Sequence, residues 1–333
     1  MKRRQVQESA AIIFAVAPMM DWTDTWCRRF HRVLTARALL FTEMVTAQAV
    51  IHGDRDRLLG FAPVERPLAL QLGGADPAAL SQAAEIGAGF GYDEINLNVG
   101  CPSDRVQEGR FGACLMEEPE TVAAAVAAMA GAVDLPVTVK CRIGVDDQEP
   151  REALFAVADA AASAGAARLY VHARKAWLQG LSPKENRTAP PLDYEIVRAL
   201  KTARPELEIC LNGGLGDLDA AAREGVGLDG VMLGRAAYET PWVLAEVDPR
   251  VYDAPAPVAD RREAALKLAT LADEAVQAGR SPHAVTRHAL GLFHGQPGAR
   301  TWRRLLSSEA VRPGATGDVV RRALEAMQSV EAG

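Results

Sequence analysis

The chain has 333 residues, 49% of them hydrophobic and 24% charged, with a net charge of −6. This composition excludes the disordered and fibrous classes and is ample for a large domain with a smaller one beside it. Five cysteines without a C-x-x-C pair argue against a disulfide framework and against a tetrahedral zinc site. We therefore expect a protein of the reducing cytoplasm, with no metal site.

The N-terminus contains "MKRR" and then "AAIIFAVAPMM", which is similar to a secretory signal. Polar residues intervene, and only 10–14 remain as an apolar region before the candidate cleavage site, which is too short. No run approaches the roughly 18 apolar residues of a membrane span. We expect neither secretion nor a membrane anchor.

Eight short apolar runs recur along the chain, separated by alanine-rich stretches with helical spacing. Most are continuously apolar, which is typical of strands covered on both faces. Strands that alternate with helices in this way predict a (β/α)8 barrel over residues 11–247. The predicted strands are 14–19, 40–44, 67–72, 94–99, 137–142, 168–173, 208–213 and 230–235. The G-x-G-x-G at 87–91 precedes a strand, so we interpret it as a helix end rather than a dinucleotide motif.

Two connections are long, 101–136 and 173–208, and both follow the carboxyl end of a predicted strand. Barrels of this type keep their active sites at that end. The second connection is polar and basic, and loops of this length are usually functional or disordered.

A proline-rich stretch, 248–257, is predicted to be a linker, and 258–333 a small helical domain. Within it, 281–322 carries seven arginines against two acids, a local net charge of +5. Such a cluster is either a footprint for a polyanion or a solvated helical face, and charge alone leaves both open.

Polar and glycine residues follow the predicted strands on the face where the site is expected. Glycine turns after strands seven and eight are the usual phosphate site of this barrel, although tight turns alone also use glycine. A phosphate at this place, with polar groups around the mouth, predicts FMN as a cofactor. The candidate residues are Pro18, Met19, Met20, Gln71, Asn98, Lys140, Arg142, His172, Asn212, Gly213, Gly214, Gly234 and Arg235. Taken alone, Gln71 is equally well interpreted as a core side chain whose hydrogen bonds are made within the protein. His172, taken alone, is equally well interpreted as a residue with a structural role.

Cys101 stands between Gly100 and Pro102, at the end of the fourth predicted strand. A free thiol is mostly protonated at neutral pH, so it serves as a general acid as well as a nucleophile. The alternative, a small buried hydrophobic residue, is how we interpret Cys27, Cys141 and Cys210, whereas Cys114 is left open.

Several segments together resemble the tRNA-dihydrouridine synthases. They are "APMMDWTD", "NLNVGCPSDRVQEGRFGACLM", "VKCRIGVDD", "LNGGL" and "VMLGRAAYETPW". Two further segments, "HARKAWLQGLSPKENR" and "GLFHGQPGARTWRR", are similar to the A-type subfamily, which acts at positions 20 and 20a of the tRNA D loop. The resemblance covers residues 14–310.

The resemblance implies an FMN enzyme that NADPH reduces and that reduces a tRNA uridine to dihydrouridine. It implies hydride transfer from flavin N5 to C6 and protonation of C5 by Cys101. It implies that Asn98 and Arg142 contact the uracil. It implies that the other strand-end residues named above contact FMN. It implies tRNA contacts for Arg187, Arg300 and Arg303. We expect tRNA as the macromolecular partner and otherwise a monomer.

Two other functions remain open from the residues alone. One is an FMN barrel enzyme that acts on a free pyrimidine, and the other is an RNA-binding protein with a silent flavin. The first gives no reason for Arg300, Arg303 and Arg304 in an appended helical segment.

Overall fold

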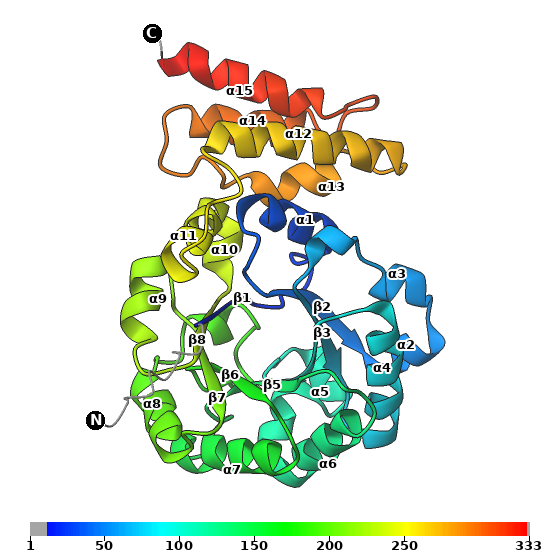
Figure 1. Cartoon of the computed structure of the whole chain (residues 1–333), viewed down its shortest axis with the longest axis vertical. Coiled ribbons are helices and arrows are strands. Elements are labelled where there is room, and N and C mark those ends of the chain that lie inside the picture. Colours follow the sequence, from blue (N-terminus) through cyan, green and yellow to red (C-terminus); the bar gives the residue numbers. More distant parts are fainter. Residues whose placement is uncertain (1–11, 332–333) are drawn as a thin grey trace, which may run out of the picture.

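The computed structural model describes residues 12–331. Eight parallel strands form one curled sheet in the order β1-β8-β7-β6-β5-β4-β3-β2 (Figure 1). The sheet closes where Leu39, just before β2, donates its N–H to Phe14 O and accepts from Val16 N, both at 2.9 Å. The strands are β1 Ile13–Val16, β2 Leu40–Thr46, β3 Leu68–Gly73, β4 Glu94–Val99, β5 Val137–Arg142, β6 Arg168–His172, β7 Glu208–Asn212 and β8 Gly230–Leu233.

All eight predicted strands are therefore confirmed, with ends that differ by at most three residues. The largest difference is in β1, which ends before Pro18, a residue without an N–H for the strand ladder. The predicted helix end at Gly91 is also confirmed, because Gly91 adopts a φ of 90° directly after the fourth helix.

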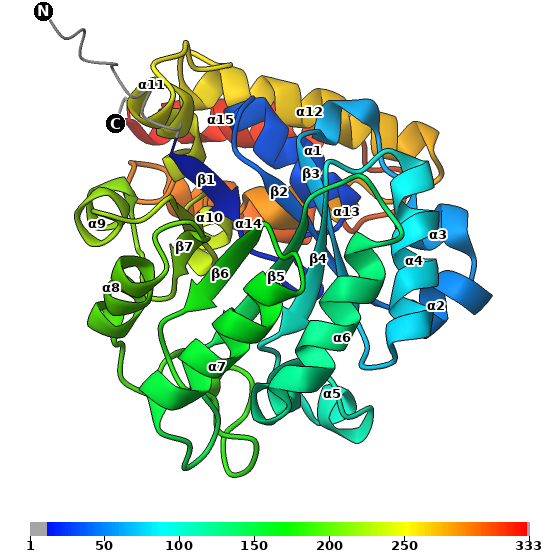
Figure 2. The same ribbon diagram turned by 60° about the horizontal axis from the view of Figure 1, so that its bottom comes forward.

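Helices surround the sheet and follow the strands in chain order (Figure 2). Most begin at an acidic or proline residue: Asp24, Asp76 and Asp217, for example, each accept a bond from a backbone N–H in the first turn. They are α1 Thr25–Leu34, α2 Ala47–His52, α3 Arg55–Leu59, α4 Pro77–Phe90, α5 Asp104–Glu108, α6 Pro119–Ala130, α7 Pro150–Ser163, α8 Tyr194–Ala203, α9 Leu218–Glu224, α10 Arg235–Glu239 and α11 Val247–Val251.

A chain of buried polar side chains runs through the barrel interior toward its mouth. Thr138 donates to Glu94 at 2.6 Å and accepts from Asn96 at 2.8 Å. Gln71 donates to Asn96 and accepts from Asn98, both at 2.8 Å. Because each of these buried groups has a partner, the chain fixes the rotamer of Asn98 at the end of β4.

The C-terminal helices pack against one another and against α1 (Figure 1). They are α12 Arg261–Gln277, α13 His283–Thr286, α14 Ala299–Ser308 and α15 Asp318–Glu331. Trp302 is fully buried among them, and its Nε1 donates to Ala289 O at 2.9 Å. Within the described chain, no helix is both long and apolar enough to cross a membrane.

The predicted linker 248–257 begins inside α11. Asp248 is 1% exposed and accepts bonds from Thr35 Oγ1 at 2.5 Å and Ala36 N at 2.7 Å. The start of this proline-rich stretch is therefore fixed to the barrel just after α1.

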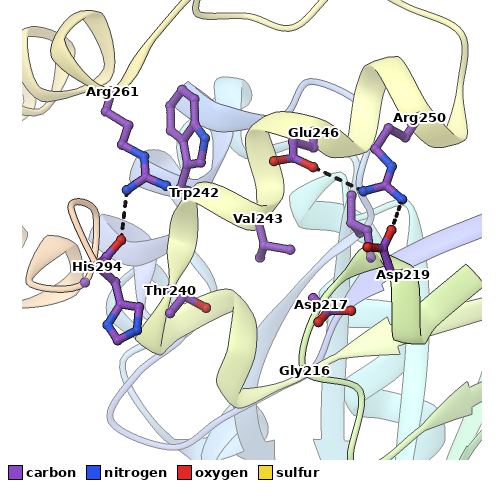
Figure 3. Close-up of a pocket in the computed structure, with 12 residues that line it drawn as sticks. Gly216, Asp217, Asp219, Thr240, Trp242, Val243, Glu246, Arg250, Arg261 and His294 are labelled. Carbon is purple, nitrogen blue, oxygen red and sulfur yellow. Dashed lines mark hydrogen bonds and ion pairs between the residues drawn. The ribbon is translucent and has the colours of Figure 1, made fainter. Parts of the chain in front are cut away.

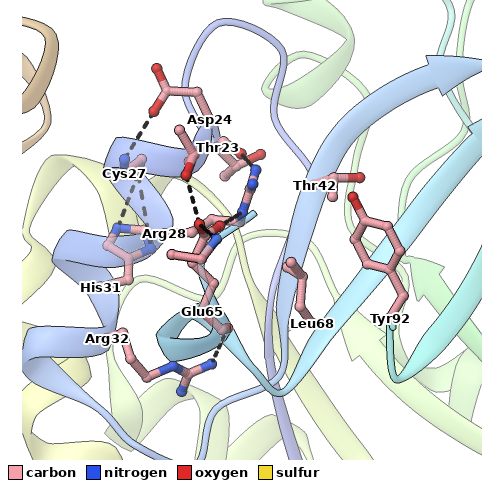
Figure 4. A network of polar contacts seen from close by, with 12 residues as sticks. Thr23, Asp24, Cys27, Arg28, His31, Arg32, Thr42, Glu65, Leu68 and Tyr92 are labelled. Carbon is pink, nitrogen blue, oxygen red and sulfur yellow. Dashed lines mark hydrogen bonds and ion pairs between the residues drawn. The ribbon is translucent and has the colours of Figure 1, made fainter. Parts of the chain in front are cut away.

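A buried ion pair fixes the loop that follows β1 (Figure 4). Arg28 Nε lies 2.6 Å from Glu65, a residue with no solvent exposure, and Arg28 Nη1 donates to Thr23 O at 2.7 Å. Glu65 also accepts from Thr25 Oγ1 at 2.6 Å and from Ala62 N at 2.7 Å. Thr23 in turn bonds to the N–H of Met19 at 3.0 Å.

We expect Glu65→Gln to destabilise the protein by about 3 kcal/mol, because it leaves the buried Arg28 charge unpaired. Glu195→Gln is the matched control: it also breaks a pair with arginine, but its carboxylate is 83% exposed, so the change should be below about 1 kcal/mol. Urea unfolding of the three proteins measures both values. Equal effects of the two substitutions would contradict the role given to Glu65.

Candidate functional site

The sequence-predicted strand-end residues all lie at one end of the barrel, because all eight strands are parallel. Several are in direct contact. Lys140 bonds to Asn212, Asn98 to Gln71, and Arg235 to the carbonyl of Arg187. A Cβ placed on Gly234 would come within 3.9 Å of Met19 Sδ, so the turn after β8 lies beside the loop after β1.

Asn98 positions the loop that carries Cys101. Its Oδ1 accepts the N–H groups of Gly100 and Cys101, each at 3.0 Å, while its Nδ2 donates to Gln71. The thiol is partly exposed and lies 3.5 Å from Ser103 Oγ. Asn98, which is itself fixed by Gln71, thus holds the backbone that presents the Cys101 sulfur at the barrel mouth.

Arg142 joins this loop to the long connection after β6. Its Nε donates to Gly100 O at 3.2 Å, and its Nη1 donates to Lys175 O at 3.2 Å and Asn186 O at 2.9 Å. The side chain is only 5% exposed. Arg142 therefore sets the distance between the Cys101 loop and the connection that contains Asn186.

Lys140, Asn212 and His172 form the floor of the mouth between β5 and β7. Lys140 Nζ donates to Asn212 Oδ1 at 3.1 Å, and Asn212 Nδ2 donates to Met232 O at 2.7 Å. His172 is 8% exposed, and its Nδ1 is buried without a partner. A buried, unpaired ring nitrogen is costly, so this position suits a polar ligand atom.

The turn after β7 requires glycine. Gly213 has a φ of 107° and Gly214 a φ of 70°, both in the left-handed region. A Cβ on Gly214 would also lie 2.5 Å from Leu192 Cδ1. The turn is held by Tyr194, whose hydroxyl donates to Gly213 O at 2.7 Å.

Positive charges gather at the mouth without an acid to neutralise them. We call Lys140, Arg142, Arg174, Arg187 and Arg235 the mouth cluster. None of the five forms an ion pair with another described residue. Burial is the first cause that lowers the pKa values of Lys140, Arg142, Arg174 and Arg187, and no carboxylate of the described chain acts on them. The arrangement suits a bound anion.

The mutual repulsion is visible in the pKa values. Burial, followed by the Arg142 charge, lowers the pKa of Lys140 to about 8. Burial lowers the pKa of Arg142 to about 10, with Arg187 and Arg174 contributing. Burial and then Arg142 and Lys140 hold the pKa of His172 well below its usual range, so the imidazole is neutral at pH 7.

The seven arginines of 281–322 divide into two groups. Four form ion pairs, with Asp24, Glu309, Asp273 and Asp318: they are Arg287, Arg312, Arg321 and Arg322. Arg300, Arg303 and Arg304 are exposed on α14 and have no ion pair with a described residue. Their spacing of three and four residues places them on one face of the helix.

A separate pocket lies between the barrel and α12 (Figure 3). Its charged residues already have partners: Arg250 pairs with Asp219 and Glu246, Arg261 donates to the backbone carbonyl of His294, and Asp217 accepts from Ala220 N. Arg261 also lies over the ring of Trp242 at 5.3 Å. Because these charges are already compensated, this pocket is a weaker candidate than the mouth.

The cysteines are all free, and Cys27, Cys141 and Cys210 are buried as predicted, whereas Cys114 is partly exposed like Cys101. No group of three or more metal-ligating side chains occurs among the residues that the structure describes.

The sequence analysis did not identify Arg174, although it stands two residues after His172. Its positive charge helps to lower the pKa of His172, which places Arg174 in the mouth cluster. Ser103 was also missed, and its place two residues after Cys101 was the available signal.

A family model described as "Dihydrouridine synthase (Dus)" matches residues 15–328. A protein from Xanthomonas axonopodis pv. citri, named tRNA-dihydrouridine(20/20a) synthase, is 55% identical over 318 residues, 95% of this chain and 94% of its own. Proteins of the same name from Synechocystis sp. and Vibrio cholerae are 52% and 51% identical. They cover 94% and 96% of this chain and 94% and 98% of their own.

The repulsion within the mouth cluster predicts that Lys140 weakens the fold when no anion is bound. Because the pKa of Lys140 is about 8 rather than 10.5, the unfolded chain holds the extra proton between those values, and this group's contribution to stability rises with pH there. We expect Lys140→Met to stabilise the protein, freed of small molecules, by roughly 1 kcal/mol at pH 7, with the difference shrinking toward pH 10.

Lys201→Met is the control. Because Lys201 pairs with Asp229 at 2.8 Å, its replacement by Met should destabilise the protein. Urea midpoints at pH 7 and pH 9.5 give both comparisons. A Lys140→Met protein less stable than the wild type at both pH values would refute the unpaired charge.

Proposed function

The chain belongs to the dihydrouridine synthase family, and we propose that it reduces the C5=C6 bond of tRNA uridines at D-loop positions 20 and 20a to 5,6-dihydrouridine. One observation carries the proposal: the partly exposed Cys101 thiol lies at a barrel mouth whose cations have no acidic partner in the part of the chain that the structure describes. Such a site suits an anionic cofactor and a substrate that must accept a proton.

We propose FMN as the cofactor. The unpaired Nδ1 of His172, the open glycine turns and the uncompensated charge of the mouth cluster all fit its phosphate and polar ring edge. When bound and reduced by NADPH, FMN supplies the hydride for C6. The residues that would hold it are Pro18, Met19, Met20, Gln71, Lys140, His172, Asn212, Gly213, Gly214, Gly234 and Arg235.

The protein's own contribution to the chemistry is a proton at Cys101 Sγ. Asn98 fixes the backbone of Cys101, and the thiol gives its proton to C5 of the uracil while the new C6–H bond forms. Arg142, whose Nε donates to the carbonyl of the neighbouring Gly100, places a positive charge near the resulting thiolate. We propose that Asn98 and Arg142 also contact the uracil. They would do so through those of their N–H groups that form no hydrogen bond within the protein.

We propose that residues 258–333 form a tRNA-binding domain joined to the catalytic barrel, 11–247, by 248–257. A uridine must leave the folded D loop to reach the mouth, at a cost of roughly a few kcal/mol, and phosphate contacts elsewhere must supply that energy. The unpaired Arg300 and Arg303 of α14, and Arg187 at the mouth, suit this role. Nothing in the proposal requires a second protein chain.

Cys101→Ala should lower dihydrouridine formation at least about 100-fold, because the C5 carbanionic centre loses its proton donor. The variant should bind tRNA and accept electrons from NADPH as the wild type does. Cys114→Ala, in the same loop and also partly exposed, is the control and should stay active. An unchanged yield of dihydrouridine from Cys101→Ala, measured by mass spectrometry of the tRNA, would remove the proton-donor assignment.

Arg300→Ala with Arg303→Ala should weaken tRNA binding and reduce the slope of log K against log salt by about 2, as expected for two lost phosphate contacts. Flavin reduction by NADPH should not change. The control is Arg312→Ala with Arg322→Ala, because those two arginines are ion-paired within the C-terminal helices. Filter binding at several salt concentrations measures the slopes, and equal slopes for the two double variants would exclude α14 as the tRNA contact.

A further inference from the structure

Trp177 is the one tryptophan among the exposed large hydrophobic residues of the described chain, with 37% of its surface accessible. It belongs to the connection after β6 and is absent from both packed hydrophobic clusters, whereas its neighbour Leu178 packs against the core. The indole is therefore not part of the hydrophobic core, and its large apolar face is available to a partner.

The backbone that carries this ring is rigid. Asn186 is fully buried and holds Trp177 from both sides, with Trp177 N donating to Asn186 Oδ1 at 2.7 Å and Asn186 Nδ2 donating to Trp177 O at 2.9 Å. The next N–H, of Leu178, donates to Asp146 Oδ1 at 2.8 Å, and the preceding Ala176 forms a β-bridge with Val145. A ring presented on so fixed a segment loses little entropy on binding.

The same segment is bonded to the loop of Cys101. Gln107 Nε2 donates to Pro102 O at 2.8 Å and to Leu178 O at 2.7 Å, so one amide joins the residue after Cys101 to the residue after Trp177. Arg142 forms a second link, from Gly100 O to Asn186 O. The backbone of Trp177 is therefore held close to the loop that carries the thiol, at the rim of the mouth.

The surroundings of the ring favour a flat, anion-bearing ligand. Lys175 Nζ lies over the indole at 5.6 Å from the centroid and donates to Gln148 O at 2.7 Å. A single ammonium group covers one face of a ring at most, and the exposed surface remains for a second partner. The nearby mouth cluster attracts a phosphate backbone to the same rim.

We propose that Trp177 is a stacking platform for a nucleobase adjacent to the target uridine in the RNA. This rests on the proposed function. When the uridine leaves its stack and enters the mouth, its neighbour loses a stacking partner, and the indole replaces it, which lowers the cost of extrusion. Because every base has a π face, the contact selects an unstacked neighbour rather than a particular base.

The test compares wild type, Trp177→Ala and Trp177→Phe, each loaded with FMN, on a tRNA transcript that carries the D loop. We expect Trp177→Ala to raise the KM for tRNA about tenfold and Trp177→Phe to restore most of the loss. Flavin reduction by NADPH in the absence of RNA should be the same in all three. Val226→Ala, a 68% exposed apolar residue in the turn after α9, is the control and should leave KM unchanged.

A second arm uses transcripts with an abasic nucleotide on either side of the target uridine. One of the two transcripts should raise the KM of the wild type about tenfold. The same transcript should leave the KM of Trp177→Ala unchanged, because that variant already lacks the ring on which the missing base would stack. Additive losses with both transcripts, an unchanged KM for Trp177→Ala, or a slowed flavin reduction would each overturn the stacking role while the wild type remains active. A wild type that forms no dihydrouridine would overturn both this inference and the proposed function.

Discussion

Five cationic side chains meet at the mouth of the barrel, and none of them is paired with a carboxylate of residues 12–331. Burial, and after it the neighbouring positive charges, lowers the pKa values of Lys140 and Arg142, so these charges are unfavourable without a partner. Such an arrangement suits a bound anion. The cofactor, the substrate and the proton donor of the proposed reaction all depend on this charge.

The rest of the fold serves to hold these charges in place. The polar chain inside the barrel fixes Asn98, Asn98 fixes the Cys101 loop, and Arg142 joins that loop to the connection after β6. Glycines at positive φ bring the backbone after β7 close to the same space. The result is a preorganised mouth in which few groups must move when a ligand arrives.

The sequence predicts the barrel well because buried parallel strands leave continuous apolar runs, and strand ends then locate Lys140, His172 and Gly213. Contacts between distant segments are harder to predict. Charge counting finds seven arginines near the C-terminus, but only the tertiary structure separates the four that form ion pairs from those on α14. Asp248 is likewise assigned to a linker by its proline-rich neighbours, yet its bonds to Thr35 and Ala36 hold it to the barrel.

The central claim is that the mouth cluster binds the phosphate of FMN. Calorimetric titration of the protein, freed of small molecules, with FMN and with riboflavin tests it most directly, since the two ligands differ only in the phosphate. The account predicts that FMN binds far more tightly, that the difference falls as salt is added, and that Arg235→Ala removes most of it. Equal affinity for FMN and riboflavin, or no binding of either, would contradict it.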